Sequence, residues 1–476
     1  MDLKVNIPER VEQIIGIFKE AHFEIYIVGG AVRDLMLGKL IYDWDFTTNA
    51  TPETMLKLFS DAYYTNEYGM VGVPSESGRP YEITTYRTEH GYSDSRRPDK
   101  IEWGKSLEED LQRRDFTINA MALQLAAAEQ KTENREQRTD SNTKSRSLST
   151  DNRSTPFSLI DPFHGQKDLE RKLIRAVGDP NERFAEDALR MMRAVRIAAE
   201  LDFTVEENTL SAIKSNSKSI QNISKERVRD ELLKMLASAH PYEGVLLLKE
   251  SLLLEQILPE LEKTFGVEQK SPGRHHVYDV GTHSLMSLKN CPSTDPVVRF
   301  ACLIHDIGKP LTYKKLENGT ITFYNHEMVS TKIAARIADR LHFSNKQKDK
   351  LVKLVRWHQF TVDERQTDSA IRRFIKNVGL ENVTDMLDLR VGDRLGGGAR
   401  ETSWRLEEFK KRLIEVQKQP FSIKDLKISG TDVMDQLKIP PGPKVGEMLN
   451  KLFDEVTEKG LENDRKVLLK RLKENA

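Results

Sequence analysis

The sequence predicts an α+β protein, with a mixed sheet and helices in its N-terminal third and a helical remainder. Short apolar runs such as FEIYIVGG (residues 23–30) and YEITTYR (81–87) alternate there with a helical pattern over residues 11–21, which is typical of strands and helices around one core. From about Asp168 onward, periodic segments such as SKERVRDELLKMLA predict helices and strand patterns become scarce. Residues 128–156 are rich in Ser, Thr, Asn, Arg and Glu, so we expect a solvated or disordered insertion.

Length and composition indicate a protein of several domains. The 476 residues are 38% hydrophobic and 31% charged, so about two to four domains are expected. Lys plus Arg and Asp plus Glu both number 74, and this balance neither indicates nor excludes a nucleic-acid partner. Two cysteines exclude a disulfide framework and a multi-cysteine zinc site. Because no signal peptide or long apolar run occurs, we expect a cytoplasmic protein without membrane contact.

A first group of candidate residues lies in VGGAVRDLMLGKLIYDWDFTT, residues 28–48. Residues i and i+2 of a strand share a face, so Asp43 and Asp45 would present two carboxylates together. Such a pair can hold Mg²⁺ against substrate phosphates. Gly29 and Gly30 would let backbone N–H groups approach a triphosphate, and Arg33 would add positive charge. The combination predicts phosphoryl or nucleotidyl transfer.

Further motifs follow in order along the chain. They are RRDFTINAMAL, DPFHGQKDLERKLIRAVGDPNERFAEDALRMMRAVRIAAEL, ISKERVRDELLKML and KISGTDVMDQLKIPPGPKVGEMLNKL. With the Gly-Gly segment, this series resembles the bacterial class II tRNA nucleotidyltransferases, which add CCA to tRNA 3′ ends, and the related bacterial poly(A) polymerases. The resemblance implies a nucleotidyltransferase head (1–165), then an all-helical neck (166–238), body (239–400) and tail (401–476), with the nucleotide between head and neck.

The resemblance also implies roles for single residues. Glu82 would be a third acid facing the aspartate pair, although it could equally be a strand-surface glutamate. Arg114 and Asp115 match a segment that contacts the ribose, the alternative being a surface ion pair. Asp187 and Arg190 are three apart and would be neighbours on one helix face, where Arg donors and Asp acceptors can match the edges of cytosine and adenine. The family uses these two as an amino-acid template, whereas an i,i+3 ion pair is the plain alternative.

Two segments indicate which member of this family the chain resembles. MVGVPSESGRPYEITTYR (70–87) lacks the basic element that poly(A) polymerases usually carry there, and is similar to the tRNA enzymes. The long segment that follows, residues 88–112, disfavours enzymes that add only CC. Complete CCA addition and addition of the terminal A alone both stay open, with tRNA, CTP, ATP and Mg²⁺ as the implied partners and cofactor. The sequence does not predict the oligomeric state.

A second constellation lies in the body. Histidine and carboxylate residues there follow the order of an HD metal phosphohydrolase: His283, His305, Asp306, His326, His358 and Asp393. Such ligands suit a transition metal such as Ni, Mn, Fe or Zn, and adjacent His-Asp ligands can share or bridge ions. The implied activity is phosphatase or 2′,3′-cyclic phosphodiesterase chemistry, and a decayed site is the alternative.

Two other interpretations of the whole chain are an HD phosphohydrolase whose head only recognises RNA, and a non-catalytic RNA-binding protein. The presence of both Asp43 and Asp45 argues against each. In the tail, basic residues within 404–418 and 464–473 could form a track for tRNA phosphates, although such charges often belong to an ordinary solvated face.

Overall fold

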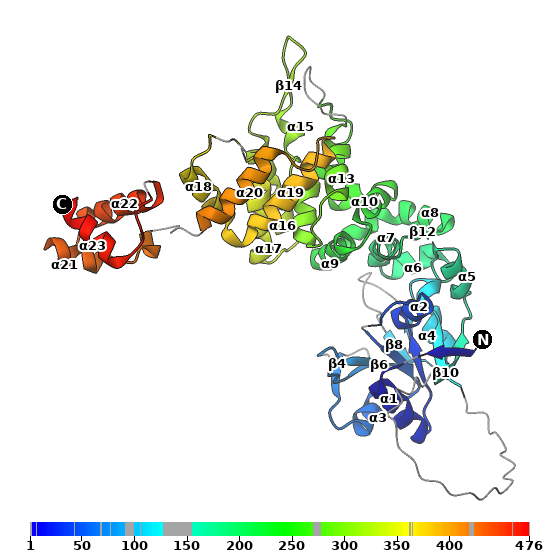
Figure 1. Cartoon of the computed structure of the whole chain (residues 1–476). Coiled ribbons are helices and arrows are strands. Elements are labelled where there is room, and N and C mark those ends of the chain that lie inside the picture. The colour runs from blue at the N-terminus through cyan, green and yellow to red at the C-terminus, as the bar shows by residue number, and fades with distance from the viewer. Residues whose placement is uncertain are drawn as a thin grey trace, which may run out of the picture. The chain divides into compact units, whose positions relative to one another are not determined.

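The computed structural model (Figure 1) describes most of the chain. It covers residues 2–475 except 6, 42, 67–68, 77, 91–99, 105, 127–154, 270–277, 361–362, 364, 418–422 and 459. Nearly all of the predicted polar insertion, residues 128–154, therefore lies outside the described residues. Thr155 and Pro156, which we had included in that insertion, instead begin strand β10 (Thr155–Ile160).

The chain divides into two compact units. The first comprises Met1–Glu231 with Leu247–Ile257, and the second comprises Leu232–Leu246 with Leu258–Ala476. The first unit holds the sheet and the second is mainly helical, which confirms the predicted α+β class. Within the described residues, no helix combines the length and the apolar character that a membrane crossing needs.

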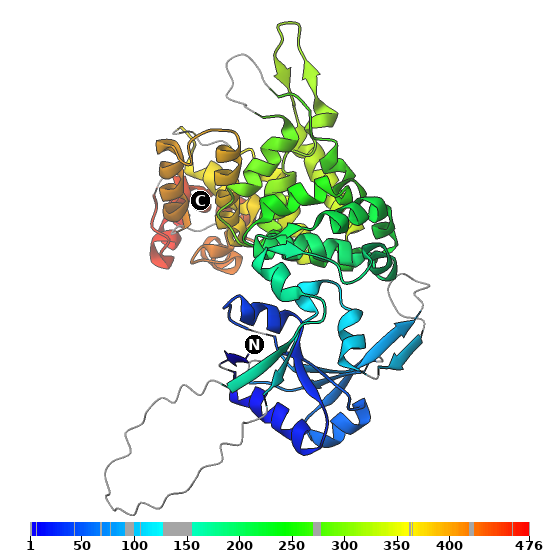
Figure 2. The same ribbon diagram turned by 90° about the vertical axis from the view of Figure 1, so that its right-hand side faces the viewer.

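An eight-stranded mixed sheet forms the centre of the first unit. Its strands lie in the order β1 (Asp2–Val5), β10, β9 (Ala122–Leu125), β2 (Ile25–Val28), β3 (Asp45–Thr48), β6 (Tyr81–Thr85), β5 (Met70–Val73) and β4 (Tyr63–Asn66). Only the pair β3 and β6 is parallel; the other neighbours are antiparallel. Helices α1 (Glu9–Glu20) and α3 (Pro52–Leu58) lie on one side of the sheet and α2 (Gly30–Met36) on the other (Figures 1 and 2).

Local sequence explains the elements that carry the sheet. In α1 the residues Val11, Ile14, Ile15 and Phe18 are buried, at the i, i+3, i+4 and i+7 spacing of one helix face. All four residues of β2 are buried, because this strand has neighbours on both edges and helices over both faces. The predicted strands in FEIYIVGG and YEITTYR are thus β2 and β6.

The first unit continues with short helices and two further strand pairs. β7 (Arg87–His90) and β8 (Lys100–Trp103) pair in the antiparallel direction, and apart from Arg87 they belong to the long segment 88–112. The helices are α4 (Leu107–Gln112), α5 (Gly165–Glu170), α6 (Pro180–Glu186), α7 (Leu189–Leu201), α8 (Glu207–Asn216), α9 (Lys225–Ala237, shared with the second unit) and α11 (Leu253–Ile257). Strands β11 (Leu173–Ile174) and β12 (Thr204–Val205) pair in parallel, so the region predicted as a purely helical neck contains a small sheet.

The second unit contains the remaining helices. They are α10 (Pro241–Glu250, shared with the first unit), α12 (Pro259–Glu262), α13 (Val280–Lys289), α14 (Pro296–Ile304), α15 (Lys309–Thr312), α16 (His326–Arg340), α17 (Asn345–Trp357), α18 (Asp368–Val378), α19 (Val383–Gly396), α20 (Trp404–Gln417), α21 (Gly430–Leu437), α22 (Pro443–Glu458) and α23 (Arg465–Glu474). A hairpin of β13 (Lys314–Lys315) and β14 (Ile321–Thr322) projects from these helices (Figure 2), which is a second departure from the all-helical prediction.

Candidate functional site

The Gly-Gly turn between β2 and α2 brings an acid and an arginine against the backbone. Gly29 has a φ of +74°, and a Cβ placed there would lie 3.0 Å from Nη1 of Arg114 and 3.3 Å from Oδ2 of Asp45. Both the backbone angle and this close approach require glycine. The turn that the sequence singled out therefore lies beside one of the two predicted aspartates.

Asp45 and Glu82 lie side by side on neighbouring strands. Asp45 begins β3 and is in register with Glu82 on the parallel strand β6, so the two side chains leave the same face of the sheet. Burial raises the pKa of Asp45 to about 6; Glu82 and Asp43 raise it as well, while Arg114 opposes the shift. Burial and Asp43 likewise raise the pKa of Glu82. Three carboxylates thus repel one another here, and a bound cation would relieve this repulsion.

The position of Asp43 differs from the predicted one. We expected it on the same strand as Asp45, but β3 begins only at Asp45. Asp43 lies in the segment before the strand, where its exposed carboxylate accepts two hydrogen bonds from Nη1 of Arg79, at 3.0 and 3.1 Å. Trp44, which lies between Asp43 and Asp45 in the sequence, is buried and fixes the position of the chain there. The i,i+2 argument therefore does not describe the pair, although Asp43 is near enough to raise the pKa of both other acids.

Arg114 and Asp115 do not form the surface ion pair that was the plain alternative. Arg114 donates to Asp110, with 3.3 Å between Nη2 and Oδ2. Asp115 is buried and accepts hydrogen bonds from Nε of Arg193 at 2.8 Å and from Nδ2 of Asn119 at 3.1 Å. Burial opposes ionisation of Asp115, but Arg193 and Asn119 outweigh it and hold the pKa of this carboxyl well below its usual range.

Asp187 and Arg190 do not lie on one continuous helix, which corrects the prediction. Helix α6 ends at Glu186, and Asp187 has extended backbone angles, φ −143° and ψ 104°. Helix α7 starts at Leu189, whose N–H donates to Oδ1 of Asp187 at 2.9 Å. Asp187 thus caps the second helix instead of continuing the first, because a side-chain oxygen there satisfies an N–H that has no partner within the helix.

The partners of the two residues differ accordingly. Asp187 forms a salt bridge with Arg227 of α9, with 2.7 Å between Oδ2 and Nη2. Arg190 pairs with Glu186, and its Nη2 donates to the carbonyl of Arg113 at 3.0 Å. The two side chains therefore do not form an i,i+3 ion pair with each other. Each is held in place by a different neighbour.

These residues surround one cavity of about 310 Å³ within the first unit. Its lining comprises Gly29, Gly30, Asp45, Arg113, Arg114, Asp115, Asn119, Asp187, Leu189, Arg190, Arg193 and Arg227. Seven predicted site residues are among them. Asp43, Glu82 and Arg33 are not; Arg33 instead donates to Asp34 at 2.8 Å and to Asn119 at 3.0 Å. The size of this cavity and the five arginines that line it suit a nucleoside triphosphate.

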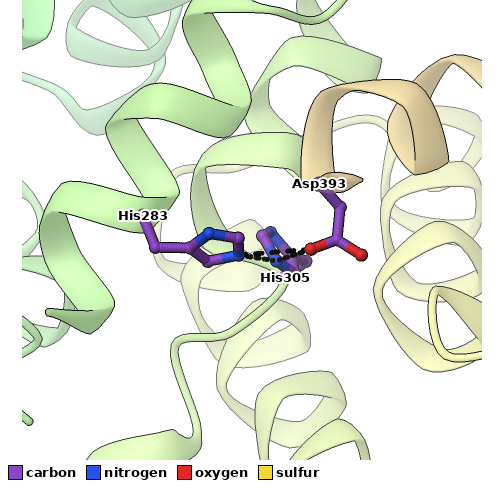
Figure 3. Close-up of side chains that lie close together, drawn as sticks. All are labelled: His283, His305 and Asp393. Atoms are coloured by element: carbon purple, nitrogen blue, oxygen red, sulfur yellow. Dashed lines mark hydrogen bonds and ion pairs between the residues drawn. The ribbon is translucent and has the colours of Figure 1, made fainter. Parts of the chain in front are cut away.

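The second unit gathers all six predicted body ligands. His283 lies on α13, His305 and Asp306 follow α14, His326 begins α16, His358 follows α17 and Asp393 lies on α19. Their ligand atoms form two groups, each within 4.8 Å: His283, His305 and Asp393 (Figure 3), and Asp306, His326 and His358. In the described parts of the chain, the three head acids do not meet this criterion.

The body cluster is buried and electrostatically paired. Nε2 of His283 lies 3.2 Å from Oδ1 of Asp393 (Figure 3), and Nζ of Lys309 lies 2.5 Å from Oδ2 of Asp306. Burial opposes ionisation of Asp306, but His305 and Lys309 outweigh it and keep the pKa of Asp306 well below its usual range. All of these side chains except that of His305 line a cavity of about 340 Å³, together with Arg390 and Gln359, among others.

Sequence reasoning missed four residues that hold these sites together: Arg79, Arg193, Arg227 and Lys309. The first three pair with acids that lie 36 to 78 positions away in the chain, and no local pattern predicts such pairs. Lys309 is different, since it lies three residues after Asp306 in HDIGK. This i,i+3 spacing could have predicted the contact between Lys309 and Asp306.

Three family models match successive parts of the chain. A Poly A polymerase head domain matches residues 25–175, the model "Probable RNA and SrmB-binding site of polymerase A" matches 202–265, and tRNA nucleotidyltransferase domain 2 matches 320–472. With acids on neighbouring strands beside a Gly-Gly turn, the first match indicates a head domain of the nucleotidyltransferase class.

Whole-length relatives give the family. The chain is 33% identical to a CCA-adding enzyme of Ligilactobacillus salivarius (strain UCC118), over 98% of this chain and 97% of the relative. It is also 33% identical to one of Pediococcus pentosaceus, over 97% and 96%. Among solved structures, the CCA-adding enzyme of Bacillus stearothermophilus in complex with CTP has a TM-score of 0.69 and 27% identity, covering 98% of both chains. The chain belongs to the CCA-adding enzyme family.

Proposed function

We propose that this protein adds C, C and A to the 3′ end of tRNA, from CTP and ATP and without a nucleic-acid template. Relatives that match it over nearly their whole length are CCA-adding enzymes. The observation that carries the proposal is the cavity that joins Asp45 and the Gly29 turn to Asp187 and Arg190. Addition of the terminal A alone is the alternative.

In this reaction the 3′-hydroxyl oxygen of tRNA forms a bond to the α-phosphorus of the nucleotide. The bond from that phosphorus to the β-bridging oxygen breaks, pyrophosphate leaves, and the hydroxyl proton is lost to solvent. Asp43, Asp45 and Glu82 fit Mg²⁺, because burial and mutual repulsion raise the pKa of Asp45 and Glu82 and a cation relieves this repulsion. When bound, Mg²⁺ supplies stabilisation of the charge that develops on the phosphate oxygens.

The other cavity residues would bind and orient the nucleotide. The backbone of Gly29 and Gly30 and the guanidinium of Arg114 would hold the triphosphate. Asp115, fixed by Arg193, would orient the ribose. Asp187 offers acceptors and Arg190 offers donors for the base edge, as selection of C and A without a template requires.

Two tRNA transcripts test this proposal. One ends before CCA and the other ends in CC, and each is incubated with CTP, ATP and Mg²⁺ before the products are sized. Extension of both by the wild-type protein supports complete addition. Extension of only the second supports A-only addition, and extension of neither contradicts the proposal.

We further propose that the body cluster hydrolyses phosphate esters. The observation that favours this second activity is the convergence of six metal-ligand side chains, five of which line one cavity together with Lys309 and Arg390. In hydrolysis the oxygen of water forms a bond to phosphorus, the ester P–O bond breaks and the leaving oxygen takes up a proton. The candidate substrates are 2′,3′-cyclic phosphates and simple phosphate monoesters, assayed with Mn²⁺, Ni²⁺, Fe²⁺ or Zn²⁺. Absence of turnover with all four metals would contradict it.

The division into head, neck, body and tail follows the same resemblance. We propose that the tail, from residue 401, contributes to tRNA binding through its basic residues, since affinity for RNA depends on contacts to the phosphate backbone. Deleting that region would be expected to weaken tRNA binding and leave the cavity of the first unit intact.

A further inference from the structure

We propose that the aromatic ring of Tyr63 is a stacking platform for the 3′-terminal base of the tRNA that is being extended. The end of the tRNA would lie on the sheet of the first unit, with its base against this ring and its 3′-hydroxyl beside Glu82. The inference deepens the proposed nucleotide addition, on which it rests, by assigning a subsite for the acceptor strand.

The first argument is a row of residues in register across four neighbouring strands of the sheet. Asp45 of β3 pairs with Glu82 of β6. Glu82 pairs with Gly72 of β5, and Gly72 pairs with Tyr63 of the edge strand β4. Residues paired in this way project from the same face of a sheet. Tyr63 therefore shares a face with the two acids, and in the row only a residue without a side chain separates it from Glu82.

This face of the sheet is exposed along the row, whereas the opposite face is covered. Val71 and Ile83, which follow the opposite face of β5 and β6, are fully buried. Glu82 is exposed, and Tyr63 is 46% exposed. An aromatic ring thus lies on accessible surface in the same row as two of the acids that are proposed to hold Mg²⁺.

The second argument is the position of the Tyr63 ring. A Cβ placed on Gly72 would lie 2.8 Å from Cζ and 3.1 Å from the hydroxyl oxygen of Tyr63. The ring therefore reaches across Gly72 toward the strand of Glu82, and a side chain at position 72 would have to displace it. Because neighbouring strands are about 5 Å apart, the far end of the ring is about one strand spacing from Glu82. The ribose of a single nucleotide fills such a gap.

The third argument is the direction from which the attacking hydroxyl must come. In an in-line displacement the attacking and leaving oxygens lie on opposite sides of the phosphorus. The cavity proposed to hold the nucleotide is lined by Gly29, Arg114 and Asp45 but not by Glu82. In the strand order, β2 with the Gly29 turn lies on one side of β3, and β6 with Glu82 lies on the other. With the pyrophosphate at Gly29 and Arg114, the tRNA end approaches over β6 and β5, toward Tyr63.

The chemistry of a bare aromatic ring suits an RNA end whose base changes. Single-stranded RNA is commonly bound by stacking its bases on aromatic side chains, and such stacking accepts every base. Stepwise addition requires this tolerance, because each added nucleotide presents a new terminal base to the same subsite. A side chain that hydrogen-bonds to the base edge would favour one base over the others. The alternative role for Tyr63 is to cover Gly72 without contacting RNA.

A double-mutant cycle between the ring and the base separates these two roles. One tRNA ends in CC, and the other is the same tRNA without the terminal cytosine base but with its ribose and 3′-hydroxyl. ATP is supplied, because complete addition and A-only addition both act on this end. The kcat/KM for tRNA is measured for wild type, Tyr63→Ala and Tyr63→Phe. Tyr64→Ala is the matched control, because Tyr64 is also 46% exposed, lies on the same strand and pairs with Val71 on the opposite face.

We expect wild type to extend the intact end at least about tenfold more efficiently than the abasic end, the effect of one stacked base. Tyr63→Ala should lower kcat/KM for the intact end to the value for the abasic end, and should change the value for the abasic end less than about twofold. Tyr63→Phe, which keeps the ring, and Tyr64→Ala should behave like wild type.

Equal losses on both ends in Tyr63→Ala would show that the ring only supports the strand, and would overturn the inference. Equal extension of the two ends by wild type would overturn it as well, and this result does not depend on the folding of a variant. In both cases the intact end is still extended, so the proposed nucleotide addition stands. Failure of wild type to extend the intact end would contradict the proposed function and this inference together.

Discussion

Asp187 and Arg227 form a salt bridge, with 2.7 Å between Oδ2 and Nη2, that ties the break between α6 and α7 to α9. Asp187 also caps α7 through the N–H of Leu189. The carboxylate proposed to read the base is therefore fixed from two sides before any nucleotide binds, and preorganisation of this kind lowers the cost of recognition.

Replacing Arg227 should consequently reduce the selectivity of the enzyme among the four nucleotides. In Arg227→Gln the Asp187 carboxylate loses a charged donor, and we expect the preference for CTP and ATP over UTP and GTP to fall about tenfold, the effect of one lost charge-assisted hydrogen bond. Incorporation of each nucleotide alone into tRNA measures this. Arg229→Gln on the same helix, whose guanidinium pairs with the neighbouring Asp230, is the matched control; equal selectivity in the two variants would show that Arg227 is only structural.

The pair of Asp115 and Arg193 should make stability depend on pH. Because the folded-state pKa of Asp115 is lowered, its contribution is complete above the unfolded value of about 3.9 and is lost as pH falls toward the folded value. Wild type should exceed Asp115→Asn in urea midpoint at neutral pH, and the difference should narrow below about pH 4. A difference that stays constant down to pH 3 would argue against an ionised Asp115 in the folded protein.

The two centres should act independently. The body ligands belong to the second unit and the head acids to the first, so His305→Ala with Asp306→Ala should abolish metal-dependent hydrolysis and change nucleotide addition less than about twofold. Circular dichroism would verify that the variant is folded. If a folded variant stopped adding nucleotides, the two sites would be coupled and this division would be wrong.

The sequence predicts those features that depend on residues close together in the chain, and it does not predict those that depend on distant residues. The spacing of apolar residues predicts α1, β2 and β6, because burial of one face depends on local order. The six body ligands could be named because their types and order match a known motif. The end of α6 at Glu186 could not be predicted, since every residue of EDALR is compatible with a helix and Arg227, the residue that pairs with Asp187, lies 40 positions away.

The position of Asp43 is a second feature that local sequence did not predict. The i,i+2 rule applies only where both residues belong to one strand, and the strand starts at Asp45. The partner that holds Asp43, Arg79, comes from another segment. That the two aspartates act together stays a prediction; Asp43 contributes to the raised pKa of Asp45, but the strand geometry from which the prediction was argued is not found.

The most direct test of the central claim compares wild type with Asp43→Ala and Asp45→Ala on a tRNA that lacks CCA, with CTP, ATP and Mg²⁺. Nucleotide incorporation and tRNA binding are measured on the same preparations. Loss of a metal ligand should lower incorporation at least about a thousandfold, because the ion stabilises the transition state by several kcal/mol. Binding should stay within about threefold, since it depends on contacts to the RNA backbone spread over the chain. Wild-type incorporation of C, C and A with inactive but binding-competent variants is the predicted result; incorporation by either variant at the wild-type rate would contradict it.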